Sequence, residues 1–256
     1  MFPLLFDRGN LYQFLSLLLL SLNTSIIKIF CYSTTMEKLS SLYRNDDVTS
    51  LDPDVRAYLD AEFLPTLENM NAKNPKVLVV FSGGNAMGKS SLSAKISKEL
   101  QGIVIENDAI KRAIIRRAPD IDSHNELNPL TWKYSMDLYN RLPSLTANGL
   151  IIRDSVIDWY FDRILTIFED AGYRIFIVQY EISKERAKEL IEVRGDTPTV
   201  TTEHLLAQIE EHAFHQQRFR AQYSADVILD ESHIFDYDQV IEKLKLVIDE
   251  LSPTTA

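Results

Sequence analysis

Five short runs of apolar residues, rich in β-branched side chains, are spread along the chain. None alternates regularly between apolar and polar positions, so each is typical of a strand that is buried on both faces. Helical patterns separate the runs, and this alternation favours a parallel sheet with helices on both faces. The predicted strands are Lys76–Phe81, Ile103–Ile105, Leu150–Ile152, Ile175–Tyr180 and Val227–Leu229. We therefore expect an α/β fold with a five-stranded parallel sheet.

The pattern around these strands divides the chain into three parts. Asp52-Pro53 is a typical helix start, because an Asp cap is followed by a first-turn Pro and then by apolar residues at helical spacing. We expect residues 36–75 to be a helical extension that packs on the core, and residues 76–252 to be the main domain. Residues 183–222 of that domain are strongly charged and helical, with a break near Gly195. We expect them to form a helical lid.

Residues 1–35 are an apolar extension. Residues 9–27 carry no charge, but seven of these 19 residues are Asn, Gln, Ser or Thr, which is a weak match to a membrane-spanning helix. Asp7 lies beside Arg8 and no Ala-x-Ala follows, which argues against a secretory signal. A targeting segment or anchor over residues 11–27, a disordered extension, and an upstream extension before a working start at Met36 remain open. We expect a cytoplasmic protein with no stable membrane partner unless residues 11–27 anchor it.

Composition excludes several classes of protein. The single cysteine, Cys31, cannot form an internal disulfide or a zinc site with several cysteines. The net charge of −10 repels phosphate backbones, so generic nucleic-acid binding is not expected. A chain with a negative net charge can nevertheless contain a local basic pocket. Three of the eight glycines lie within six residues of one another, at Gly83, Gly84 and Gly88. This clustering indicates a backbone shape that requires glycine.

The segment after the first predicted strand fits the pattern G-x-x-x-x-G-K-[ST], with a strand before it and a helix after it. The backbone N–H groups of such a loop point into one concavity, and the following helix adds its positive N-terminal dipole. Lys89 is expected to neutralise the β- and γ-phosphates of ATP, and the Ser90 hydroxyl to bind Mg²⁺. The sequence thus predicts a P-loop NTPase fold. The predicted nucleotide-binding residues are Gly83, Gly84, Asn85, Ala86, Met87, Gly88, Lys89, Ser90 and Ser91.

Other motifs restrict the class of P-loop protein. The chain has neither the guanine-reading Asn-Lys-x-Asp nor the switch Asp-x-x-Gly of GTPases. Motor ATPases usually have an apolar strand that ends in Asp-Glu, whose Glu activates water. Here the third strand is followed by Arg153, Asp154 and Ser155. Asp154 is therefore a candidate Mg²⁺ residue, whereas the hydrolytic Glu is absent.

A second carboxylate follows the second predicted strand, at Asp108. Because ligands of parallel α/β sheets lie at the carboxyl ends of the strands, Asp108 should face the same crevice as the P-loop. A carboxylate there can accept the proton of a substrate hydroxyl as it attacks the γ-phosphate. Lys111 and Arg112 share its helix face and are expected to orient the acceptor. The alternative is an Asp that caps a solvated basic helix.

Four segments together resemble the P-loop kinases of the zeta-toxin and chloramphenicol-phosphotransferase group, and more distantly adenylylsulfate and gluconate kinases. These segments are FSGGNAMGKSS (81–91), IENDAIKR (105–112), GLIIRDS (149–155) and IEVRGD (191–196). The resemblance covers residues 76–229. It implies that Asp108 is the base and that Lys111 and Arg163 bind substrate. It also implies that Arg194 contacts the γ-phosphate from the lid.

The lid departs from the pattern of this group. Such lids often carry two Arg four residues apart, and the earlier position here is Leu190. Either another lid arginine takes over this role or phosphoryl transfer is slower. The candidate substitutes are Arg186, Arg218 and Arg220.

The histidines predict no metal centre. Only His212 and His215 are suitably spaced, three residues apart on an acidic helix, and we expect this pair to be solvated. Trp132 and Trp159 are expected to be core residues or pocket walls.

The leading hypothesis is an ATP- and Mg²⁺-dependent phosphotransferase that acts on a hydroxyl of a small molecule. Its catalytic residues would be Asp108, Lys89 and Arg194. One alternative is a 5′-hydroxyl polynucleotide kinase, supported by a basic cluster and opposed by the net charge. Another is a non-kinase P-loop ATPase or regulatory protein. The basic cluster consists of Lys111, Arg112, Arg116 and Arg117.

Overall fold

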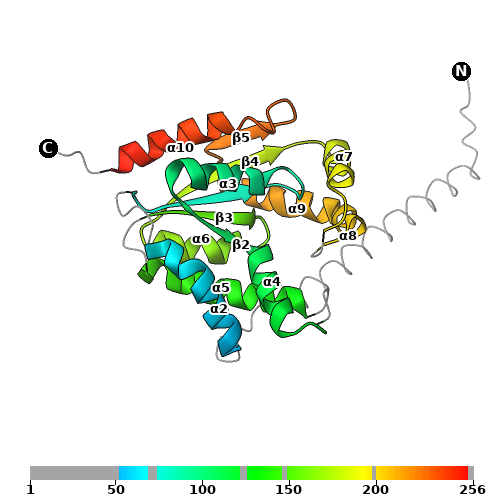
Figure 1. Cartoon of the computed structure of the whole chain (residues 1–256). Coiled ribbons are helices and arrows are strands. Elements are labelled where there is room, and N and C mark those ends of the chain that lie inside the picture. The colour runs from blue at the N-terminus through cyan, green and yellow to red at the C-terminus, as the bar shows by residue number, and fades with distance from the viewer. Residues whose placement is uncertain (1–51, 69–73, 122–125, 146–148, 198–199, 253–256) are drawn as a thin grey trace, which may run out of the picture. The chain divides into compact units, whose positions relative to one another are not determined.

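The computed structural model describes residues 52–68, 74–121, 126–145, 149–197 and 200–252. Strands and helices alternate through most of these residues (Figure 1). The strands are β1 (Val77–Ser82), β2 (Ile103–Glu106), β3 (Leu150–Val156), β4 (Arg174–Glu181) and β5 (Val227–Asp230). The helices are α2 (Pro53–Glu68), α3 (Lys89–Leu100), α4 (Asn107–Arg117), α5 (Leu127–Leu145), α6 (Phe161–Asp170), α7 (Lys184–Arg194), α8 (Thr202–Ala207), α9 (Ile209–Arg220) and α10 (Tyr237–Leu251).

The five strands form one sheet in the order β2-β3-β1-β4-β5, and every neighbouring pair is parallel. The predicted α/β P-loop fold is confirmed, and each predicted strand lies within one observed strand or within one residue of it. β3 is longer than expected, because Phe81 pairs with Val156 beyond a shift in register. This extension brings Asp154 and Ser155 into the sheet.

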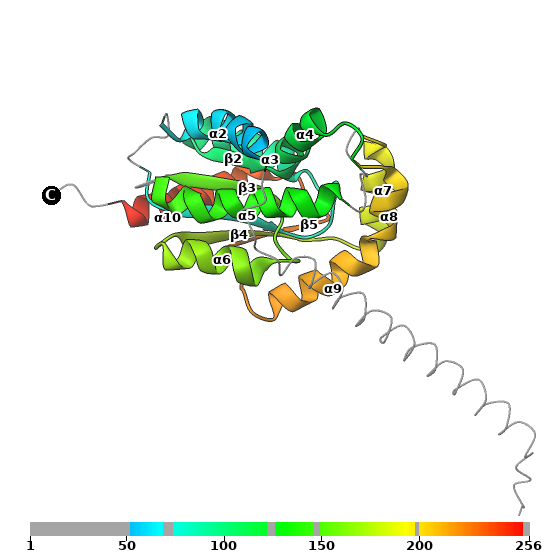
Figure 2. The same ribbon diagram turned by 90° about the horizontal axis from the view of Figure 1, so that it is seen from below.

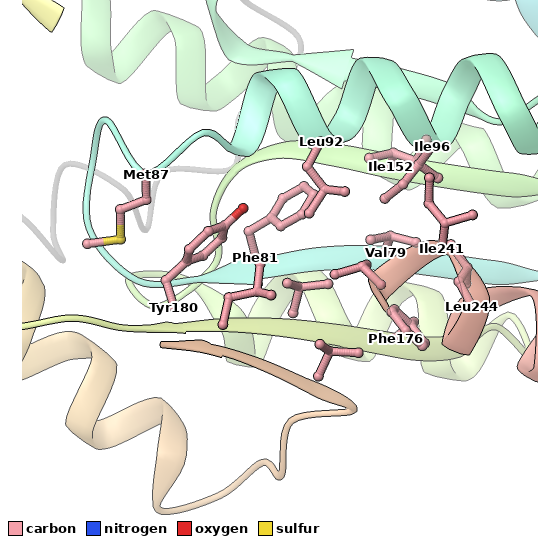
Figure 3. Packing of buried hydrophobic residues seen from close by; sticks show 14 of the residues in the cluster. Val79, Phe81, Met87, Leu92, Ile96, Ile152, Phe176, Tyr180, Ile241 and Leu244 are labelled. Atoms are coloured by element: carbon pink, nitrogen blue, oxygen red, sulfur yellow. The ribbon is translucent and has the colours of Figure 1, made fainter. Parts of the chain in front are cut away.

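Helices cover both faces of the sheet. Figures 1 and 2 show α3 and α10 on one face and α5 and α6 on the other. The face below α3 and α10 holds a continuous cluster of buried side chains, which runs from Leu244 and Ile241 through Val79 to Phe81 and Tyr180 (Figure 3). All the residues of β1 are buried, as a central strand between two helical layers requires.

Helix α2 packs against α4 and β2. Asp52 caps it, because its Oδ1 accepts the backbone N–H of Asp54 at 2.8 Å. Val55 and Leu59 are each 2 % exposed. Arg56 reaches the buried carboxylate of Asp137 in α5 at 3.0 Å. The helix is thus held to the domain by both apolar and ionic contacts.

The predicted lid residues form α7, α8 and α9, which lie beyond the carboxyl ends of the strands (Figure 1). The break expected near Gly195 separates α7 from α8. Residues 1–35, including the candidate anchor over 11–27, lie outside the described residues, as do 36–51 of the expected helical extension. Of the helices that are described, none is long and apolar enough to span a bilayer.

Candidate active site

The loop between β1 and α3 is held in shape by residues from distant parts of the chain. Gly83 has a φ of 129° and Gly88 a φ of 83°, which are conformations that glycine adopts readily. A Cβ on Gly83 would lie 2.9 Å from the Cβ of Tyr180, and one on Gly88 would overlap the hydroxyl of Tyr237. Tyr237 donates a hydrogen bond to the Gly88 carbonyl at 3.1 Å. The loop therefore needs glycine both for its torsion angles and for the close approach of β4 and α10.

Lys89 lies at the start of α3 and is 8 % exposed. Its Nζ donates a hydrogen bond to the carbonyl of Gly84 and lies 6.0 Å from the centroid of the Tyr180 ring. Burial lowers the pKa of Lys89 to about 8, although Asp154 and Asp158 act in the opposite direction. An anionic ligand in this loop would offset the desolvation of the ammonium group.

Asp154 lies at the carboxyl end of β3 and faces α3. Burial raises the pKa of its carboxyl, while a hydrogen bond from Ser90 and the charge of Lys89 lower it. A carboxylate beside a hydroxyl at the end of a P-loop is an oxygen donor set that suits Mg²⁺, most of whose ligands are phosphate oxygens and water. Among the described residues no group of three or more His, Cys, Asp or Glu side chains is placed to hold a metal. Ser90 and Asp154 are thus the protein residues that fit the predicted ion.

A third carboxylate, Asp158, lies beneath the P-loop and was not expected from the sequence. It is 0 % exposed, and its Oδ2 accepts the backbone N–H of Gly83 at 2.8 Å. Burial raises its pKa to about 6, against the effect of the Gly83 hydrogen bond and the Lys89 charge. Only its place between apolar Ile157 and Trp159 hinted at burial. Asp158 therefore orients the first amide of the phosphate-binding loop.

The acceptor residues predicted on α4 differ in their surroundings. Asp108 is in the first turn of α4, and its charge raises the pKa of Lys111, whereas burial, the larger effect, lowers it. Arg112 is exposed and pairs with Glu106, the last residue of β2, at 3.4 Å. Arg163 in α6 lies over the ring of Trp132, with its Cζ 5.8 Å from the ring centroid.

Arg194 is the last residue of α7 and its side chain is exposed. Its charge lowers the pKa of Lys89, after the larger effect of burial, and it does the same to Lys111. Lys89 belongs to the P-loop and Lys111 to the helix that carries Asp108.

The three candidate substitutes for the arginine missing at Leu190 each contact another residue. Arg186 pairs with Glu189 at 2.8 Å, and the Cζ of Arg218 lies 5.9 Å from the centroid of the Phe161 ring. Arg220 pairs with Glu181 at 3.5 Å. Arg220 is also close enough to Asp158 to lower its pKa slightly against burial.

The prediction that His212 and His215 are solvated is wrong, because they are 8 % and 1 % exposed. The Nδ1 of His212 accepts a hydrogen bond from Trp159 Nε1 at 3.2 Å, and its Nε2 lies 2.8 Å from the side-chain amide of Asn85. His215 stacks on Trp159, with 4.4 Å between ring centroids. Burial lowers the pKa of His212 to about 3 and that of His215 to about 4. These residues connect lid helix α9 to the tip of the P-loop.

A pocket lies between the P-loop and the lid. It is lined by Gly84 and Asn85 of the loop, by His212 and by apolar side chains of α7, α8 and α9. The apolar lining residues from these helices are Ala187, Ile191, Leu205, Ile209 and Ala213.

The family model of the AAA domain matches residues 78–219, which is more than half of the chain. This segment begins in β1 and ends in α9, and it includes the P-loop and every predicted site residue. No curated protein matches the sequence.

Solved structures similar to the chain share little sequence with it. A structure of the PezAT chromosomal toxin–antitoxin system of Streptococcus pneumoniae is 14% identical, with 82% of this chain and 92% of that chain covered and a TM-score of 0.51. A gluconokinase from Sinorhizobium meliloti is 14% identical, over 72% of this chain and 99% of that one, with a TM-score of 0.45. The tunicamycin resistance protein of Deinococcus radiodurans is 17% identical, over 68% and 95%, also with a TM-score of 0.45. The first of these shows a common fold.

Proposed function

The chain belongs to the AAA domain family, and on that premise we propose that it is an ATP- and Mg²⁺-dependent kinase that transfers the γ-phosphate to a hydroxyl of a small molecule. The observation that carries the proposal is that the P-loop and α4 both follow carboxyl ends of parallel strands, with Asp154 of β3 between them. Asp154 accepts a hydrogen bond from Ser90 of the P-loop and pairs in register with Glu106, the residue before α4. Lys89 and Lys111 are the cations on the two sides. A transferring phosphoryl group would lie between these cations.

Each of the site residues has its own role in phosphoryl transfer. The P-loop amides and Lys89 bind the phosphates, and Asp158 keeps the Gly83 amide in place. Asp108 accepts the proton of the attacking hydroxyl, and Lys111 orients the acceptor. Arg194 stabilises the charge that develops on the γ-phosphate oxygens.

Two further groups complete the nucleotide site in this proposal. Mg²⁺, held by Ser90 and through water by Asp154, would supply neutralisation of charge between the β- and γ-phosphates. Phe235, which follows β5, is 55 % exposed, and its ring edge is 3.0 Å from where a Cβ on Gly88 would be. An exposed ring beside the P-loop is suited to stacking on the nucleotide base.

The geometry gives less support to a polynucleotide kinase. Each arginine of the basic cluster on α4 has a partner: Arg112 pairs with Glu106, Arg117 with Asp54, and Arg116 donates to the Tyr58 hydroxyl. An arginine that already has a carboxylate partner attracts a phosphate backbone less strongly. The small-molecule acceptor is therefore the function we favour.

A phosphoryl-transfer screen tests the proposal. Purified full-length protein is incubated with ATP labelled at the γ-phosphate, Mg²⁺ and pooled sugars, nucleosides, antibiotics and 5′-hydroxyl RNA. We expect label in a small-molecule pool and none with Lys89→Ala. Label in RNA would favour the polynucleotide kinase. Steady hydrolysis that no hydroxyl compound stimulates would favour an ATPase and contradict the proposal.

A further inference from the structure

One buried charge has no use in the proposed reaction. Arg153, in β3 beside Asp154, is 3 % exposed. Its Nη1 donates hydrogen bonds to the carbonyls of Ser155 and Val156, each at 2.8 Å, whereas its Nε is buried and has no hydrogen-bond partner. None of the ion pairs among the described residues includes Arg153. Burying a guanidinium without a counter-ion lowers the stability of the folded chain, because the charge loses its hydration. A buried arginine in this position therefore needs an explanation.

Two further donors without partners lie close to this arginine. Tyr139 of α5 is 0 % exposed, and its ring centroid is 5.9 Å from the Cζ of Arg153. The hydroxyl of Tyr139 and that of Ser155 are both buried without a hydrogen-bond partner. Arg153 faces α5, and Ser155 follows it by two residues in the stretch of β3 where the register with β1 shifts. Asp154, between them, faces α3 instead.

The position of these donors matches the acceptor side of the proposed site. Arg153 pairs with Ile105 of β2 in the parallel register, and Asp108 follows three residues after Ile105. Ordered water would satisfy the two hydroxyls, but it would leave the guanidinium charge without a counter-ion. An anion satisfies all three donors and the charge together.

We propose that Arg153, Tyr139 and Ser155 form a subsite for an anionic group, a carboxylate or a phosphate, on the acceptor. The inference rests on the proposed function and narrows its substrate class to hydroxy acids or phosphorylated alcohols. The guanidinium holds the anion, and this leaves the hydroxyl of the acceptor free to face Asp108. Arg153 is then a residue of substrate binding and specificity.

Matched sets of compounds test the subsite. One set is glycerol, glycerate and glycerol 3-phosphate, and the other is glucose, glucuronate and glucose 6-phosphate. Binding to the full chain is measured by titration calorimetry with Mg·ADP present at saturation, so that the P-loop is not available to the anion. We expect at least one charged member to bind tenfold or more tightly than its neutral counterpart, as charge-assisted hydrogen bonds predict. The carboxylate and phosphate arms show which anion is preferred.

Variants connect this preference to the three residues. Arg153→Gln should abolish the preference for the charged member, and Tyr139→Phe, which removes one oxygen, should weaken it about tenfold. Arg174→Gln is the control, because Arg174 begins β4 at the amino ends of the strands, away from the proposed site, and pairs with Asp226. It removes one positive charge and should leave the preference unchanged. If Arg153→Gln does not fold, Tyr139→Phe and Ser155→Ala decide the matter.

The outcomes separate this inference from the proposed function. Equal binding of charged and neutral members, including no binding of either, would overturn the subsite. A preference that survives Arg153→Gln, or Tyr139→Phe and Ser155→Ala together, would also overturn it. Failure of the wild type to bind Mg·ATP would instead refute the proposed function. Phosphoryl transfer to neutral alcohols, with no preference for charged acceptors, would support the proposed kinase function and refute only the anion subsite.

Discussion

The side-chain amide of Asn85 in the P-loop lies 2.8 Å from Nε2 of His212 in the lid helix α9. The other ring nitrogen, Nδ1, accepts a hydrogen from Trp159. The atom of Asn85 in this contact is the amide nitrogen Nδ2, and burial lowers the pKa of His212 to about 3, so the imidazole is neutral near pH 7. The tip of the P-loop is therefore joined to the lid by a neutral histidine.

Replacing His212 should loosen both the fold and the nucleotide site. His212→Ala leaves Trp159 Nε1 and the Asn85 amide without their partner, which should lower the free energy of unfolding by about 1–3 kcal/mol. We also expect the KM for ATP to rise several-fold, because the tip of the P-loop is less restrained. Urea unfolding and steady-state kinetics measure the two effects. Gln217→Ala, an exposed position on the same helix, should change stability by less than about 0.5 kcal/mol.

The pH dependence of stability follows from the same residue. Burial lowers the pKa of His212 to about 3, so below about pH 6.5 the unfolded chain binds a proton that the folded chain does not. Above this pH the contribution of His212 to the free energy of unfolding has its full value. The contribution declines as the pH falls toward 3, by at most about 1.4 kcal/mol per pH unit. His215, with a pKa lowered to about 4, acts in the same direction. An equally steep decline in His212→Ala would contradict this assignment.

Asp158 should have the opposite pH dependence. Burial raises the pKa of its carboxyl from 3.8 to about 6, so the folded chain binds the extra proton between these values and the ionised group costs stability above pH 6. Asp158→Asn keeps an oxygen that can accept the Gly83 N–H and removes the buried charge. We expect it to raise the free energy of unfolding by at most about 3 kcal/mol at pH 8 and to have little effect at pH 4. Denaturant unfolding at both pH values tests the sign, and destabilisation at pH 8 would refute it.

Asp108→Asn should separate catalysis from nucleotide binding. The amide keeps the size of the side chain but cannot accept the proton of the acceptor, so we expect kcat to fall about 100- to 10,000-fold. The Kd for Mg·ATP should stay near the wild-type value, because Asp108 lies on α4 and not in the P-loop. Calorimetry and rates of labelled phosphoryl transfer give the two quantities. An equal loss of binding and transfer would indicate that Asp108 has a structural role.

Arg194→Ala tests the lid. Loss of one oriented cation that contacts the transferring group typically costs about 2.7–4 kcal/mol, which is a 100- to 1,000-fold decrease in kcat. We also expect the pKa of Lys111 to rise, because the Arg194 charge contributes to lowering it. Rates of phosphoryl transfer and NMR titration of the lysine provide the measurements. Lys188→Ala is a matched control on the same helix, since Lys188 is exposed and pairs with Glu192 at 3.8 Å.

The sheet and the phosphate-binding loop could be predicted from the amino-acid sequence, because both depend on neighbouring residues. A run such as Val77–Phe81 must be buried on both faces wherever it lies, and the glycines of the P-loop set the path of their own backbone. The family model of the AAA domain matches residues 78–219, which contain these segments from Leu78 onward.

The burial of polar side chains could be seen only in the folded chain. His212 and His215 lie on a charged helix whose sequence does not reveal which face packs, and their burial depends on Trp159, more than 50 residues away. Asp158 and Arg153 likewise acquire their surroundings from the P-loop and from α5. Burial and desolvation arise between segments that are distant in sequence, so a local pattern does not contain them.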